Sequence, residues 1–150
     1  MSMFSAFNIN ASGLTSQRYR MDVISENVAN ANTTRTEDGT PYRRKVVTFA
    51  QKGDQTSFGR VLGSVSLYHG YSGQGVKVDG VYEDTETEMN MVYDPSHPDA
   101  DENGYVTYPN VNIITEMTNL IDASRAYEAN ATAFNASKSM ALQGLQLTQQ

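Results

Sequence analysis

The sequence predicts an α+β fold in which a long helix at each end of the chain flanks a small antiparallel β-rich module. Near both termini, apolar residues recur every three or four positions, which is the spacing of a heptad helix. Between these segments the apolar period changes to two, the spacing of strands. We therefore expect three parts: an N-terminal helix in residues 1–35, a β module in 36–109 and a long helix in 110–150. The two helices are expected to form an antiparallel, coiled-coil-like pair.

The N-terminal segment carries its apolar residues on one heptad seam. The seam consists of Phe7, Asn10, Leu14, Gln17, Met21, Ile24, Val28 and Ala31. We expect a helix over about residues 12–31. It should end among Asn30, Asn32, Thr33 and Thr34, because asparagine tolerates the left-handed conformation that closes helices. Polar residues on a seam weaken the pairing of helices but can fix its register.

The middle of the chain alternates turns and short strands. Asp38-Gly39 supplies the bend of a turn over residues 36–41. The strands are expected at residues 42–49, 60–68, 75–82 and 87–93, and residues 105–108 are expected to be extended. The basic run 43–45 is interpreted as a solvated strand edge.

The C-terminal segment has the longer seam. It consists of Ile113, Met117, Leu120, Ser124, Tyr127, Ala131, Phe134, Lys138, Ala141 and Leu145. Asn112 is the expected N-cap, and Glu116 places a negative charge in the first turn, where the helix dipole favours it. A helix of roughly 33 residues is about 50 Å long, which is unusual for a packing helix in so short a chain.

The composition excludes several classes of function. A net charge of −6 and a pI near 4.8 argue against binding to nucleic acid or to an anionic membrane surface. The absence of cysteine rules out disulfides and thiolate metal sites. No apolar stretch is long enough for direct membrane insertion. The N-terminus lacks the basic and apolar regions of a cleaved signal peptide.

No motif of catalysis or cofactor binding is present, so we expect no catalytic, cofactor-binding or metal site. One alternative is a calcium-regulated surface-binding module that uses Asp99, Asp101 and Asn103. These residues match the first half of an EF-hand loop, but the twelfth position, which requires glutamate, is Asn110.

Two terminal motifs resemble those of the bacterial flagellar rod and hook family. The motifs are SGLTSQRYRMDVISENVANANT (residues 12–33) and VNIITEMTNLIDASRAYEAN (111–130). The segments VYDPSHPDADENGYV (92–106), PNVN (109–112) and GTPYRRK (39–45) narrow the resemblance to the proximal rod. It covers nearly the whole chain except about residues 51–73. A different subunit of the rod and hook family is the second interpretation.

The resemblance implies a structural subunit, not an enzyme, that leaves the cell through the flagellar type III export apparatus without a cleaved signal. Such subunits assemble into a hollow axial shaft in the basal body, within the cell envelope. The implied partners are copies of the chain, other rod proteins, basal-body ring and export-gate components, and hook–basal body proteins.

The expected assembly contacts lie on both terminal helices. They are Leu14, Met21, Ile24, Asn27, Asn30, Asn32, Glu116, Met117, Arg125, Tyr127, Asn130 and Phe134. The apolar members would pack, and the asparagines together with a Glu116/Arg125 pair would fix the register between copies. Each residue could instead hold together the chain's own helix pair.

Overall fold

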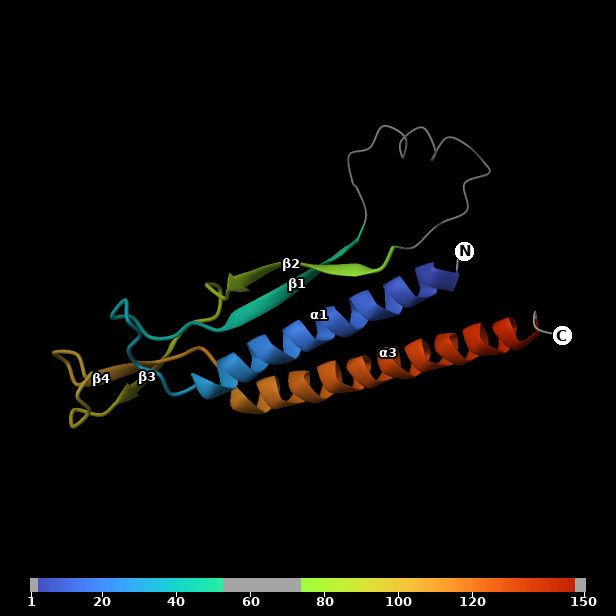
Figure 1. The fold of residues 1–150 in the computed structure, drawn as a ribbon. Helices are drawn as coiled ribbons and strands as arrows, with labels where there is room; N and C mark the ends of the chain where they lie inside the picture. The colour runs from blue at the N-terminus through green and yellow to red at the C-terminus, as the bar shows by residue number, and fades with distance from the viewer. Residues whose placement is uncertain (1–2, 53–73, 148–150) are drawn as a thin grey trace, which may run out of the picture.

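Two long antiparallel helices form the shaft of the molecule (Figure 1). The structure is a computed structural model, and it describes residues 3–52 and 74–147. Helix α1 spans Met3–Ala29 and helix α3 spans Ile113–Leu147. The start of α1 and the end of α3 lie at the same end of the shaft. The predicted helix pair and the α+β class are therefore confirmed.

Helix α1 begins well before residue 12, so its predicted start is wrong. The early turns are helical because the long α3 offers them a partner. The rings of Phe7 and Phe134 meet edge to face at 5.1 Å, and Asn10 Nδ2 donates to Ser137 Oγ at 3.5 Å. The prediction that a left-handed asparagine closes the helix is also wrong. In the described ranges, only glycines have positive φ.

The predicted seam of α1 is confirmed, because all of its members are buried or half-buried. On α3 the face toward α1 is rotated from the prediction. The buried and half-buried line there includes Glu116, Ala123, Asn130, Ser137 and Gly144. Four members of the predicted seam are instead exposed: Ile113, Met117, Lys138 and Leu145.

Small side chains explain this rotation, because they let the two helices approach closely. At Gly13 of α1, an added Cβ would lie only 2.7 Å from Asn130 Oδ1. A face built from Met117 and its neighbours would hold the helices further apart. The most deeply buried line of α3 therefore consists of small and polar residues, and Met117 stays outside.

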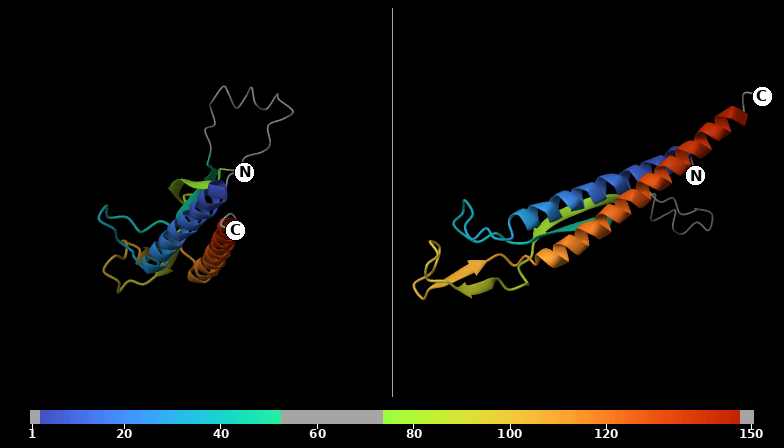
Figure 2. Two further views of the ribbon diagram at one scale, coloured as in Figure 1. Left: turned by 45° about the vertical axis from the view of Figure 1, so that its right-hand side comes forward. Right: turned by 90° about the horizontal axis from the view of Figure 1, so that it is seen from below.

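Within residues 36–52 and 74–109, the strands of the β module form two separate antiparallel ribbons. Strand β1 (Lys45–Gln51) pairs with β2 (Val76–Glu83), with an irregularity between Thr48 and Phe49. Strand β3 (Asn90–Tyr93) pairs with β4 (Tyr105–Tyr108). The β1–β2 ribbon lies along α1, and the β3–β4 ribbon extends beyond the start of α3 (Figures 1 and 2).

Three of the expected extended segments are found as strands with shifted ends, and residues 105–108 form β4. The strand expected at 60–68 lies outside the described residues. The turn at 36–41 is confirmed: Thr36 N donates to Thr40 O at 2.8 Å, and Gly39 has a φ of 77°. Glycine suits this position because a left-handed backbone is costly for residues with a Cβ.

The apolar core is small and lies where the helix ends meet the ribbons. Ala31, Tyr42 and Val111 form one buried cluster, and Val106 of β4 is fully buried. Much of the remaining buried surface at this place is polar. The packing of the ribbons on the helices therefore depends on how these polar groups are satisfied.

Candidate functional site: a polar joint and an uncovered helix face

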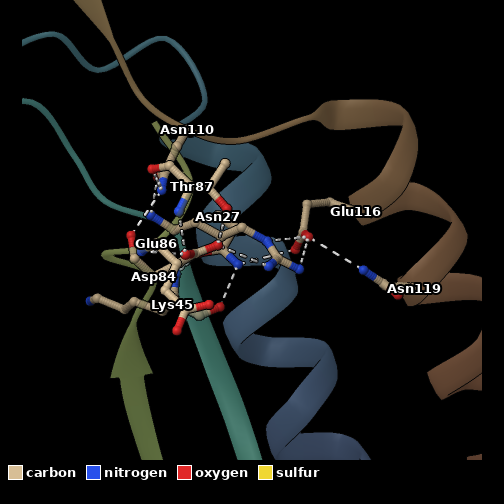
Figure 3. A network of polar contacts seen from close by, with 9 residues as sticks. Asn27, Lys45, Asp84, Glu86, Thr87, Asn110, Glu116 and Asn119 are labelled. Atoms are coloured by element: carbon tan, nitrogen blue, oxygen red, sulfur yellow. Dashed lines mark hydrogen bonds and ion pairs between the residues drawn. The ribbon is translucent and has the colours of Figure 1, made fainter. Parts of the chain in front are cut away.

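Six residues form a network where the helix pair meets the ribbons, and Figure 3 labels four of them: Asn27, Asp84, Asn110 and Glu116. We call this network the polar joint. Its members are Asn27, Tyr42, Arg44, Asp84, Asn110 and Glu116. They come from both helices and from the segments beside β1, β2 and β4, so the joint connects every part of the fold.

An ion pair lies at the centre of the joint. Arg44 Nε and Nη2 both donate to Glu116 Oε1, at 2.9 and 2.8 Å. Asn27 Nδ2 donates to the second oxygen, Glu116 Oε2, at 3.1 Å. The Glu116 side chain is only 1 % exposed, so this carboxylate needs its partners.

Asn27 attaches α1 to the first residue of β1. Its Oδ1 accepts the Lys45 N–H at 2.9 Å, and its Nδ2 donates to Lys45 O at 2.8 Å. One side-chain amide thus satisfies both backbone groups of an edge residue, as a neighbouring strand would. The Tyr42 hydroxyl also donates to Asn27 Oδ1, at 2.9 Å.

Asn110 connects the segment after β4 to the end of the β1–β2 ribbon. Its Oδ1 accepts the Arg44 N–H at 2.9 Å. Its Nδ2 donates to Asp84 O at 2.9 Å and to Thr87 O at 3.2 Å. A single amide therefore holds together the segments before β1, after β2 and before α3.

Two titratable groups of the joint are shifted. Burial raises the pKa of Tyr42 to about 12. Three carboxylates add to this effect: Glu26, Glu116 and Glu83. The pKa of Asp84 lies below its usual range, mainly because the N–H and hydroxyl of Thr87 donate to its carboxylate. Arg44, at 3.5 Å, adds a smaller contribution.

The joint corrects one sequence interpretation. Arg44 is not part of a solvated strand edge, because its side chain is 26 % exposed and bonded to Glu116 and Asp84. Sequence reasoning missed Tyr42, Arg44, Asp84 and Asn110 as members of a site. The sequence did contain a signal for the ion pair. A basic run (43–45) precedes a predicted strand, and an acid, Glu116, lies in the first turn of a predicted helix.

Within the chain, Glu116 already has a charged partner. It pairs with Arg44, while Arg125 is exposed, so a Glu116/Arg125 contact between copies would first require this buried pair to break. The prediction that Asn112 caps the N-terminus of α3 is confirmed. Its Oδ1 accepts the N–H groups of Ile114 and Thr115, at 3.0 and 3.2 Å.

The twelve expected assembly residues fall into three groups by burial. Ile24, Asn27 and Glu116 are buried; Leu14, Met21, Asn30, Tyr127, Asn130 and Phe134 are half-buried; Asn32, Met117 and Arg125 are exposed. Only the exposed group is fully available to a neighbour in this structure. Whether any of the twelve contacts another molecule remains a prediction.

One uncovered face of α3 is strongly apolar. Ile114, Met117 and Ile121 are 78 %, 55 % and 53 % exposed. Exposed Arg125 follows one turn after Ile121. Residues at this spacing lie on one side of a helix. We call these four residues the outer strip.

The acidic loop between β3 and β4 uses its carboxylates to support turns. Asp101 Oδ1 accepts the N–H groups of Asn103 and Tyr105, at 2.9 and 2.8 Å. Asp99 accepts the Thr34 hydroxyl at 2.8 Å. No group of three or more metal-ligating side chains occurs in residues 3–52 and 74–147. In the same ranges, no helix has the length and apolar character to cross a membrane.

In a comparison with known proteins, two family models match the two terminal segments of the chain. The model of the "flagella basal body rod protein" family matches residues 7–35, and that of the "flagellar basal body rod FlgEFG protein C-terminal" family matches residues 102–147. A flagellar basal-body rod protein FlgC from Bacillus subtilis is 46 % identical, over 98 % of this chain and 99 % of its own length. The chain belongs to the FlgC family of flagellar basal-body rod proteins.

Other FlgC proteins are similar over equally long regions. The one from Borreliella burgdorferi is 45 % identical over 99 % of both chains. The one from Salmonella typhimurium is 40 % identical over 99 % of this chain and all of its own. This FlgC-family chain is thus a structural subunit of the flagellar basal-body rod.

Proposed function

We propose that this chain polymerises with copies of itself and with other rod proteins into the hollow proximal rod, the axial shaft that carries torque for motility. The observation that carries the proposal is the outer strip. A helix pair that buries its small residues and exposes isoleucine and methionine has a face suited to a protein neighbour.

The polar joint supports a mechanical role for the chain. Charged and amide groups are directional, so the joint fixes the angle between the shaft and both ribbons. A subunit that transmits torque needs such fixed geometry. No catalytic group and no cofactor has a part in this role.

We further propose that the chain reaches the rod through the flagellar type III export apparatus, partly unfolded and without a cleaved signal. The small core and the polar residues on the helix seams support this, because they make the free chain easy to open. The proposed partners along this route are export-gate and basal-body ring components, with hook–basal body proteins beyond the rod. Within the chain we propose the three functional parts 1–35, 36–109 and 110–150.

The test is complementation of a strain that lacks this chain. Tyr127→Asp is a poor probe, because Tyr127 is half-buried and its loss would disturb the helix pair itself. Met117→Asp/Ile121→Asp instead places charges on the outer strip. We expect folded protein by circular dichroism, but no rods in isolated basal bodies and no swimming.

Ala133→Asp is the matched control, because it adds a charge at an exposed position of α3 that lies about 80° or more round the helix from each residue of the strip. This variant should swim. Motile Met117→Asp/Ile121→Asp cells with intact rods would contradict the proposal.

A further inference from the structure

A second exposed apolar surface lies on the β3–β4 ribbon. Met91, Tyr93 and Tyr105 are 71 %, 64 % and 45 % exposed. In the strand register Met91 is opposite Thr107 and Tyr93 is opposite Tyr105, so the three side chains share one face. We call these three residues the ribbon face. The β3–β4 ribbon lies beyond the start of α3, and the outer strip is in the first turns of that helix (Figure 2).

Contacts within the ribbon fix the side chains of the ribbon face, although no other part of the described chain covers them. The rings of Tyr93 and Tyr105 pack edge to face at 5.2 Å. Gly104 has a φ of 81°, and a Cβ there would lie 3.0 Å from the Tyr93 ring. Asp101 fixes the adjoining turn through two backbone N–H groups. These contacts therefore fix the positions of the two tyrosine rings, although the rings cover no core of the chain itself.

The outer strip carries a cation, whereas the loop beside the ribbon face carries acids. Between Lys77 and Arg125 the sequence contains no lysine or arginine. The ribbon face adjoins a loop that contains exposed Asp101 and Glu102, whereas the outer strip ends at exposed Arg125, which has an exposed acidic residue three positions before it and another three positions after it. Two ribbon faces would oppose acids to acids. A ribbon face against an outer strip can instead bring the acidic loop of one copy to Arg125 of the other.

We propose that the ribbon face of one copy docks on the outer strip of a second copy, with the acidic loop facing Arg125. Met91 and the tyrosine rings cover Ile114, Met117 and Ile121. This contact joins two different surfaces, so it repeats from copy to copy and builds an open helical array rather than a closed dimer. The inference rests on the rod function proposed above, for which it supplies one contact between copies.

The absence of cysteine makes the contact directly testable. Tyr93→Cys and Ile121→Cys are placed in separately tagged copies and expressed together. Isolated basal bodies are then treated with a short bismaleimide. We expect a cross-linked product that carries both tags. Tyr93→Cys with Ala11→Cys, an exposed position on α1, is the control pair and should give at most a fifth of that yield.

A charge exchange tests the same contact independently of the cysteines. Arg125→Glu alone should lower swimming and cross-linking at least fivefold, and adding Glu102→Lys should restore both. Lys138→Glu, an exposed reversal on the same helix, should change neither.

The outcomes separate the two proposals. If the chain is in the basal body but the Tyr93–Ile121 product does not exceed the control and the exchange gives no rescue, the docking proposal is wrong and the rod function stands. A product that joins Tyr93→Cys to a different basal-body protein also overturns it. If the wild-type chain is absent from basal bodies, the proposed function fails and the docking proposal fails with it.

Discussion

Arg44 and Glu116 form a bonded pair in which two guanidinium nitrogens, at 2.8 and 2.9 Å, donate to one carboxylate oxygen. The pair connects the residue before β1 to the first turn of α3. Because the Glu116 carboxylate is buried and Arg44 is partly exposed, the arginine determines whether a buried charge is compensated.

Arg44→Met should therefore destabilise the chain by about 2–3 kcal/mol, since it leaves a buried carboxylate without its cation. Urea unfolding at neutral pH measures the change. Arg43→Met is the control, because the adjacent Arg43 forms no ion pair in the described part of the chain; it should cost less than about 0.5 kcal/mol. Equal losses in the two variants would show that the pair has no special role.

Asn110→Asp should cost about 3 kcal/mol, because it replaces an N–H donor with a carboxylate oxygen facing the carbonyls of Asp84 and Thr87. Asn112→Asp makes the same chemical change two residues later. It should be neutral or slightly stabilising, since aspartate caps helices as well as asparagine does and suits the dipole. Thermal unfolding of the two variants gives the comparison, and a stable Asn110→Asp protein would contradict it.

Gly144→Ala should stabilise the chain by about 1 kcal/mol, because a Cβ there meets no atom of residues 3–52 and 74–147 within 4 Å and alanine favours helix. Gly13→Ala should gain much less, since its Cβ would displace the Asn130 side chain. Gly13→Ala/Asn130→Ala should recover the gain, which a double-mutant cycle in urea would reveal. Equal effects of the two glycine substitutions would argue against close contact at Gly13.

Stability should fall as the pH rises from 10 towards 12, in part because of Tyr42. In the unfolded chain this hydroxyl loses its proton near the ordinary value of 10.0, whereas the folded chain keeps it until about pH 12. The unfolded state then binds fewer protons, so unfolding becomes more favourable with increasing pH.

Tyr42→Phe should remove this contribution to the slope of the unfolding free energy against pH. At neutral pH it should cost about 1 kcal/mol of stability, because the hydrogen bond to Asn27 is lost. Unfolding free energies measured across the alkaline range would show both effects. Tyr82→Phe, at an exposed position, should retain the slope. An unchanged slope in Tyr42→Phe would mean that its hydroxyl titrates normally.

The sequence by itself determined the two helices, their antiparallel pairing, the Asn112 cap and the family. These depend on local spacing, on capping chemistry and on long contiguous motifs. Only the tertiary structure decided which face of α3 meets α1, because heptad spacing does not fix the rotation of a helix about its own axis. Close approach at Gly13 selected the small, polar face and left Met117 outside. The partner of Glu116 was likewise beyond sequence reasoning, since Arg44 lies 72 residues away and is brought to it by the fold alone.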